Sequence, residues 1–114
     1  MPRPTDPATA ARPAVLVASP LEPRLVDRIR TAVPGVDVLH EPDLVPAARF
    51  ASDHVGIPPR LGPAGLEHWR ALLARAEVMF DFDWHAPAAW RENSPRLRWI
   101  QGTSAGVGAR AQAA

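Results

Sequence analysis

The chain has 114 residues, enough for one small domain with a thin hydrophobic core. Its 13 basic residues, all arginine, are scattered among 12 carboxylates, and a net charge of +1 gives no sign of a nucleic-acid-binding surface. The lack of cysteine excludes disulfides and thiolate chemistry, and no apolar run is long enough to cross a membrane. We therefore expect a cytoplasmic domain that binds neither nucleic acid nor membrane.

The first forty residues predict one βαβ unit. Residues 1–13 are rich in proline and alanine and lack the apolar core of a secretory signal, so we interpret them as a disordered leader. Residues 14–18 form a short apolar run, typical of a strand buried on both faces. Apolar residues then recur at helical spacing over 25–33, up to a Pro-Gly stop, and residues 36–40 alternate as a second strand.

The rest of the chain continues the alternation of strands and helices. Residues 41–60 carry four prolines and no sustained period, which predicts either an ordered excursion or a mobile flap. A helix with one apolar face is predicted from Pro63 onward. Strands are expected at 78–82 and 97–101, with a short helical turn at 87–93 between them.

This element order predicts an α/β fold with a flavodoxin-like, doubly wound parallel sheet of about four strands, incomplete as it stands. Ligands of such sheets bind beyond the carboxyl ends of the strands. The segments at 81–85 and 102–108 follow the third and fourth strands. These two segments are therefore where we expect a site.

The glycine-rich segment after the fourth strand matches two catalytic patterns only in part. Gly102 to Gly106 fits G-x-S-x-G, but a nucleophilic Ser104 would need an acid and a histidine later in the chain, and none follows. Residues 106–111 fit G-x-G-x-x-A, yet a dinucleotide site also needs a following helix and strand. Glycines can instead turn successive N–H groups toward an anion such as a carboxylate, and a plain tight turn is the alternative.

A D-x-D-x-H cluster, Asp81, Asp83 and His85, follows the third strand. Metal or phospho-acceptor chemistry is conceivable there, but three ligands on one turn are few, and the chain has no lysine to assist a phospho-acceptor. We expect solvated turn residues, no metal site, and His85 near the cleft. Trp84, at the strand end, is also expected there.

The remaining histidines and tryptophans have simpler interpretations. We expect surface or interface positions for His40, His54 and His68. We expect core or helix-packing positions for Trp69, Trp90 and Trp99.

Several of these segments, in this order, resemble a known family. The string W-I-Q-x-x-S-A-G-V over 99–107, with the strand and turn at 76–83 and the first strand at 14–18, resembles the substrate-binding domain of D-isomer-specific 2-hydroxyacid dehydrogenases. The resemblance covers residues 14–108 and leaves 109–114 as a disordered tail. It implies the N-terminal, substrate-binding part of an NAD(P)-dependent oxidoreductase that acts on the CH–OH group of small D-2-hydroxy acids.

In that family, the loop after the fourth strand holds the substrate carboxylate through backbone amides. Carried over by position, the resemblance implies that the amides of Ala105 and Gly106 bind a small 2-oxo or 2-hydroxy acid. The neighbours expected in the cleft are Ser104, Val107, Trp84 and His85.

The chain also departs from the family. Gly108 stands where the family usually has aspartate, and the family's cofactor domain and catalytic residues lie in chain beyond residue 114. None of Arg98, Arg110 or His85 occupies a catalytic motif position. We therefore assign no catalytic residue and no residue that binds NAD or NADP, and we expect the chain alone to be inactive.

The family's substrate domain is completed by chain that returns after the cofactor domain. Without it, we expect an exposed apolar face, marginal stability and a tendency to form homo-oligomers. Two alternatives stay open. One is a non-catalytic flavodoxin-like module that binds a small carboxylate or a protein, and the other is a truncated serine hydrolase built on Ser104.

Overall fold

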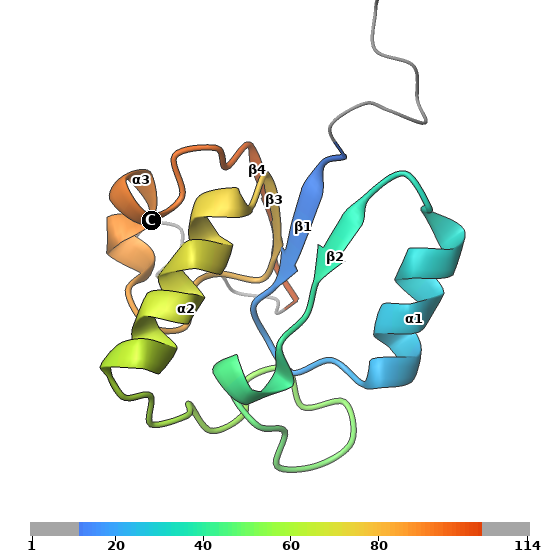
Figure 1. The fold of residues 1–114 in the computed structure, drawn as a ribbon. Coiled ribbons are helices and arrows are strands. Elements are labelled where there is room, and N and C mark those ends of the chain that lie inside the picture. Colours follow the sequence, from blue (N-terminus) through green and yellow to red (C-terminus); the bar gives the residue numbers. More distant parts are fainter. Residues whose placement is uncertain (1–11, 104–114) are drawn as a thin grey trace, which may run out of the picture.

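The sheet has four parallel strands in the order β2-β1-β3-β4 (Figure 1). The computed structural model describes residues 12–103. The strands are β1 (Ala14–Val17), β2 (Asp37–Leu39), β3 (Val78–Phe80) and β4 (Trp99–Gln101). The helices are α1 (Pro23–Ala32), α2 (Pro63–Arg75) and α3 (Trp90–Asn93), with 3-10 turns η1 (Pro42–Leu44) and η2 (Pro87–Ala89). The predicted α/β fold, an incomplete flavodoxin-like sheet of about four parallel strands, is confirmed.

The predicted leader extends two residues too far. Arg12 forms an ion pair with Asp37 at 3.0 Å and donates to the carbonyl of Val36, and the Pro13 carbonyl accepts from the Asp37 amide. These contacts hold Arg12 and Pro13 against β2. The rest of the leader, the tail and most of the glycine-rich loop lie outside the described residues.

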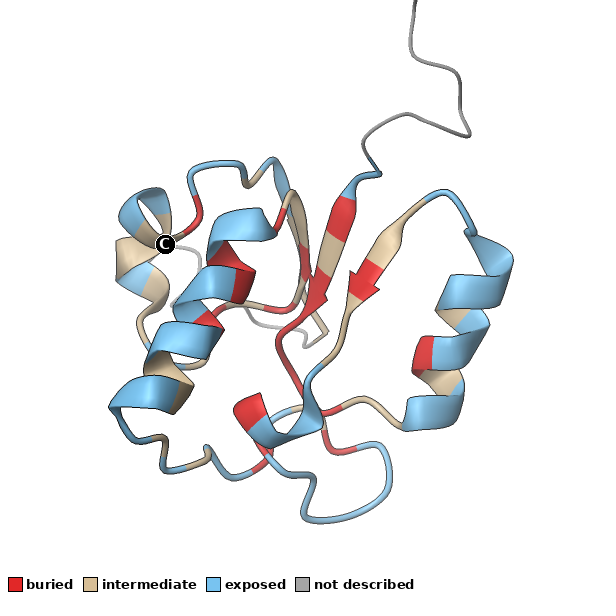
Figure 2. Ribbon diagram, viewed as in Figure 1, coloured by how far each residue is buried: buried red, intermediate tan, exposed pale blue. Residues whose placement is uncertain are grey.

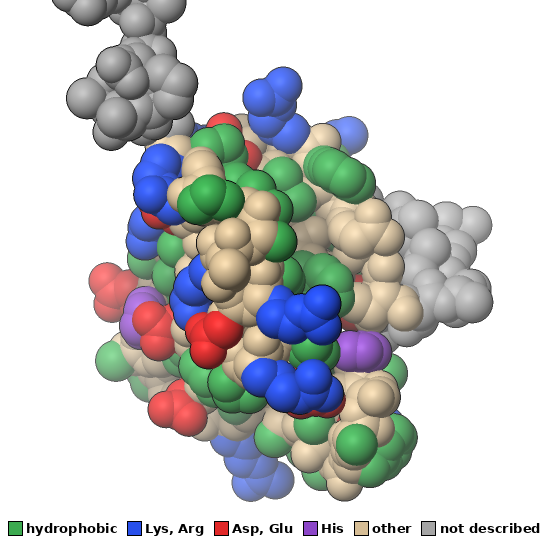
Figure 3. All heavy atoms as spheres, turned by 90° about the vertical axis from the view of Figure 1, so that its right-hand side faces the viewer, with side chains coloured by type: hydrophobic (Ala, Val, Ile, Leu, Met, Phe, Trp, Pro, Cys, Tyr) green, Lys and Arg blue, Asp and Glu red, His purple; other side chains and the backbone are tan. Residues whose placement is uncertain are grey.

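Proline places the start of both long helices. Pro23 opens α1 and Pro63 opens α2, where the fixed φ of proline suits the helix and its missing N–H is not needed. Arg30 in the last turn of α1 donates to the Val38 carbonyl and so joins α1 to β2. Seen from the side of α1 (Figure 3), basic and acidic side chains lie interspersed among hydrophobic ones.

The helices cover the two faces of the sheet unequally (Figures 1 and 2). Because side chains alternate along each strand, Leu16 and Met79 face α2 whereas Val17 and Val38 face α1. The larger core is formed by Leu16, Ala18, Leu44, Val45, Trp69, Leu72, Leu73, Ala76 and Met79. The smaller core consists of Val17, Val26 and Val38, with half-buried residues around it.

The face under α1 stays open where the sheet continues to its β4 edge. Val15, Val78 and Trp99 are register partners across β1, β3 and β4, so they point to the same side as Val38. Trp99 is 61% exposed. Val15 and Val78 are half-buried, so in this row only Trp99 is exposed, and a wider exposed apolar face stays a prediction. The core position predicted for Trp99 is wrong, because β4 is an edge strand that no described helix covers on this side.

The proline-rich segment 41–60 is an ordered excursion. Ala47 and Ile57 exchange two backbone hydrogen bonds of 2.9 Å and close a loop that we call the 46–58 loop. Inside it, the buried Asp53 accepts hydrogen bonds from both the side chain and the amide of Arg49. Gly56 has a φ of 69°, and a Cβ there would lie 2.7 Å from the Ala47 carbonyl oxygen, so only glycine fits.

Within residues 12–103, no helix combines the length and the apolar character needed to cross a bilayer.

Candidate functional site

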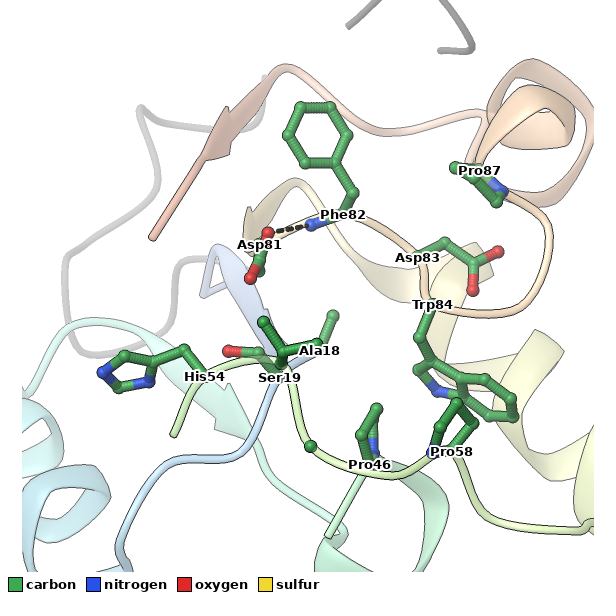
Figure 4. A pocket seen from close by; sticks show the side chains of 12 residues that line it. Ala18, Ser19, Pro46, His54, Pro58, Asp81, Phe82, Asp83, Trp84 and Pro87 are labelled. Carbon is green, nitrogen blue, oxygen red and sulfur yellow. Dashed lines mark hydrogen bonds between the residues drawn. The ribbon is translucent and has the colours of Figure 1, made fainter. Parts of the chain in front are cut away.

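A pocket of about 230 Å³ opens at the carboxyl ends of β1 and β3 (Figure 4). In the order β2-β1-β3-β4, the chain leaves β1 toward one side of the sheet and later enters β3 on the other. Open α/β sheets bind ligands at this switch point. The lining residues come from the ends of β1 and β3, the 46–58 loop and η2: Ala18, Ser19, Pro46, His54, Val55, Gly56, Pro58, Asp81, Phe82, Asp83, Trp84 and Pro87.

Ser19, two residues after β1, carries an unsatisfied hydroxyl. Its side chain is 3% exposed, and its Oγ is the one buried side-chain polar atom without a hydrogen-bond partner in the described part of the chain. Figure 4 shows this oxygen on the side of the pocket where Asp81 and His54 lie. A buried hydroxyl without a partner costs about 1–3 kcal/mol. The Ser19 hydroxyl is thus an unsatisfied polar group in the pocket wall, with almost no accessible surface of its own.

Asp81 connects the pocket to the segment that follows β4. Its Oδ1 accepts from the Phe82 amide at 2.9 Å and its Oδ2 from the Thr103 hydroxyl at 2.7 Å, while its own amide donates to the Gln101 carbonyl. Its φ of 73° is in the left-handed region, which aspartate tolerates better than most residues. Asp81 thus holds the first residues of the glycine-rich loop beside the pocket.

Asp83 holds the turn after β3 to α2. One carboxylate oxygen accepts from Trp69 Nε1 at 3.0 Å and from the His85 amide at 2.9 Å, and the other accepts from the Ala86 amide. The prediction of solvated carboxylates is wrong, because Asp81 and Asp83 are 3% and 7% exposed. The hydrogen bonds from these donors offset the cost of burying the two carboxylates. Without the carboxylates, the donors would lack these partners.

Trp84 and His85 do not share one environment. Trp84 lines the pocket, donates from Nε1 to the Leu44 carbonyl at 2.9 Å and packs beside Trp69 at 5.9 Å between ring centroids. His85 is exposed and is not among the lining residues, although its ring contacts that of Trp84. Among the residues that the structure describes, no three histidine or acidic side chains are grouped so as to hold a metal ion.

Sequence reasoning missed Ser19 and His54. His54 is half-buried in the pocket wall, with Nδ1 3.0 Å from the Pro20 carbonyl oxygen and its ring nearly perpendicular to that of Phe80. The position of Ser19 just after a buried strand was a usable signal. No local sequence pattern places His54 in the pocket. His54 reaches the pocket only through the path of the 46–58 loop, and that path depends on Asp53.

The other two histidines lie away from the pocket. His68 is exposed, with Nε2 4.0 Å from a carboxylate oxygen of Glu41. His40 is half-buried, and burial followed by the nearby Arg30 lowers its pKa.

The predicted carboxylate-binding residues Ala105 and Gly106, with Ser104 and Val107, lie outside the described residues. Gly102 and Thr103 are described and half-buried, and the Thr103 hydroxyl contacts the pocket residue Asp81. Within residues 12–103, the lining includes two carboxylates and no arginine. A ligand carboxylate would therefore be repelled by the described wall and would need donors from elsewhere.

In comparisons with known proteins, the chain matches no family model, no curated protein and no solved structure.

Proposed function

We propose that this chain is the substrate-binding part of an NAD(P)-dependent oxidoreductase that reduces small 2-oxo acids to D-2-hydroxy acids in the cytoplasm. The observation that supports this most is the pocket at the β1/β3 switch point, which Asp81 joins to Thr103 at the start of the glycine-rich loop. A loop of this kind offers backbone N–H groups to an anion. The substrate carboxylate would bind the amides of Ala105 and Gly106.

The pocket suits a small acid. Its volume of about 230 Å³ is below the range of about 300–1,000 Å³ that is usual for drug-sized ligands. Trp84 with Pro46 and Pro58 supplies apolar walls.

The described residues do not fit a nicotinamide cofactor. The turn from β1 to α1 contains no glycine, and Glu22, at the N-terminus of α1, would repel a pyrophosphate. The pocket is also smaller than a dinucleotide needs. NAD or NADP would supply the hydride from another domain, and we expect no NADH consumption by this chain alone.

Binding of glyoxylate and pyruvate to the purified full chain, followed by ligand-induced NMR shifts, tests the proposal. Ala105→Pro removes one of the two proposed amide donors and should weaken binding about 3- to 10-fold. Ala105→Gly keeps the amide and is the matched control, with binding expected to persist. If neither acid binds at millimolar concentration, or if Ala105→Pro binds as the parent does, the proposal fails.

A non-catalytic module that binds a protein is the second candidate. The observation that favours it is the exposure of three apolar side chains on the 46–58 loop, Phe50, Val55 and Ile57, which are 50–62% exposed. Such a module should be monomeric and unfold cooperatively by itself. A monomer with a sharp transition that no 2-oxo acid raises would favour this candidate over the dehydrogenase part.

A further inference from the structure

We infer that the chain forms a two-fold symmetric dimer in which Phe50 of each copy fills a second pocket on the other copy. This second pocket lies at the carboxyl ends of β1 and β2, between the N-terminus of α1, η1 and the 46–58 loop (Figure 1). The inference goes beyond the function proposed above and does not depend on it, because the dimer contact involves no substrate.

The second pocket has the size and chemistry to hold an aromatic ring. Its volume is about 320 Å³, whereas an apolar cavity of about 150 Å³ is already large enough for benzene. Most of its wall is apolar and is formed by Pro20, Leu21, Pro23, Pro42, Val45 and Pro46. Burial of a ring against these side chains is favourable, because it removes apolar surface from water.

Phe50 carries the complementary ring beside the pocket. It lies between Ala48 and Ser52, which both line the second pocket, yet Phe50 itself does not line it and is 62% exposed. The guanidinium carbon of Arg49 lies 5.3 Å from the centre of its ring. Hydrogen bonds from Arg49 to Asp53 hold this part of the loop in place. Little conformational freedom would therefore be lost when the ring is buried.

The ring and the pocket lie together on one patch, and this favours a closed pair. A two-fold interface uses the same patch on both copies, so the patch must be complementary to itself. Here a single patch holds both the projecting ring of Phe50 and a pocket that fits it. Two copies can therefore form two equivalent contacts, and the dimer leaves neither a ring nor a pocket for a third copy.

The charges around the ring and the pocket favour the same pairing. Within residues 12–103, the second pocket is lined by Glu22 and by no arginine, and the exposed Glu41 and Asp43 flank one of its prolines. The ring of Phe50, in contrast, carries the Arg49 guanidinium beside it. Exposed ion pairs add little affinity, so the charges would orient the two copies while the ring supplies most of the binding free energy.

The dimer contact would also support the wall of the candidate site. Pro46 and His54 line both the second pocket and the pocket at the β1/β3 switch point. A ring that fills the second pocket therefore restrains a shared wall without entering the candidate site.

Sedimentation velocity of the full chain tests the dimer, in the Trp99→Gln background so that contacts at the β4 edge do not contribute. One ring per copy makes a small interface, so we expect a monomer–dimer equilibrium with a dissociation constant of about 10 µM to 1 mM. Phe50→Ser should weaken dimerisation about 10-fold or more. Val33→Ser removes an exposed apolar side chain at the end of α1 and is the matched control, with dimerisation unchanged.

A mixture of two variants tests whether the ring of one copy enters the pocket of the other. Phe50→Ser removes the ring, and Ala48→Arg places a guanidinium at the wall of the second pocket. Neither variant should dimerise alone. Isotope-labelled Phe50→Ser mixed with unlabelled Ala48→Arg keeps one of the two contacts, and NMR shifts should appear at the Leu21 and His40 amides of the labelled chain.

Three results would overturn the inference: a background chain that stays monomeric up to about 1 mM, a Phe50→Ser variant that dimerises as the background does, or a mixture without these shifts. Species that grow beyond the dimer would also overturn it, because a closed pair has no contact left to offer. Each of these results leaves the binding of 2-oxo acids untouched, so the proposed function would stand or fall by its own test.

Discussion

Asp53 organises the 46–58 loop from a buried position. Its carboxylate accepts from the Arg49 guanidinium at 2.8 and 3.2 Å, from the Arg49 amide at 3.0 Å, and from the amides of Val55 and Gly56. The hydrogen bonds of the Arg49 side chain, followed by that of its amide, hold the pKa of Asp53 well below its usual range. Because His54, Val55 and Gly56 line the pocket, this carboxylate also shapes the candidate site.

The Asp53 carboxylate should make the loop sensitive to acid. Its folded-state pKa lies below its unfolded value of about 3.9, so its stabilising effect is complete above that unfolded pKa. The effect is lost as the pH falls from about 4 toward the lower folded pKa. The protection of the Val55 and Gly56 amides against hydrogen exchange, relative to the intrinsic exchange rate at each pH, should fall over this range.

The substitution Asp53→Asn removes this charge at every pH. At neutral pH it should lower the melting temperature and speed exchange of the same amides. Asp43→Asn, at an exposed position in η1, is the control and should change neither. Unchanged loop exchange in Asp53→Asn would show that the carboxylate does not organise the loop.

At the scale of elements, β4 is the least protected strand. Trp99 and Gln101 are exposed, whereas Ile100 faces the larger core. One row of side chains on the α1 side therefore runs from Val38, which α1 covers, to Trp99, which no described element covers. An exposed tryptophan at the end of an apolar row favours association between copies of the chain.

Trp99→Gln should reduce self-association at high protein concentration, measured by sedimentation velocity. Its effect on the free energy of unfolding should be small, because most of the Trp99 side chain is already in solvent. Val33→Gln, at an exposed position after α1, is the control and should leave association unchanged. Association of the Trp99 variant at the parent level would place the contact on another surface.

At the scale of the whole molecule, stability depends on two separate small cores. The core on the α2 side holds most of the large buried side chains, whereas the core on the α1 side has three buried valines, of which Val17 and Val26 are fully buried. A domain of this size has only about 5–15 kcal/mol of stability. Loss of one large side chain is therefore expected to be a considerable fraction of the total.

Leu73→Ala should destabilise the chain by about 2–5 kcal/mol, because Leu73 is 1% exposed in the larger core and its removal leaves a cavity. Val26→Ala, in the smaller core, removes fewer carbon atoms and should cost less. Urea unfolding of both variants measures the difference. An equal loss in the two variants would mean that the two cores contribute alike.

Local sequence patterns were sufficient to predict the helices and strands and their order along the chain. The apolar run at 14–18 predicted β1, and the periodic apolar face of 63–75 predicted α2. Such patterns are informative because side chains on one face recur about every second residue along a strand and about every 3.6 residues along a helix. Proline and glycine residues predicted where a helical segment ends. Parallel pairing followed from the alternation of strands and helices, because each crossover returns the chain to the same end of the sheet.

The tertiary structure alone decided which polar groups are buried and what they contact. Asp83 looks like a solvated turn residue until Trp69 of α2 is brought to 3.0 Å from it, and Trp84 finds its acceptor at Leu44, forty residues earlier. Ser19 and His54 meet in one pocket because the 46–58 loop folds back over the end of β1. A local sequence pattern reports the side of an element that is buried, whereas hydrogen-bond partners depend on distant segments that meet only in the folded chain.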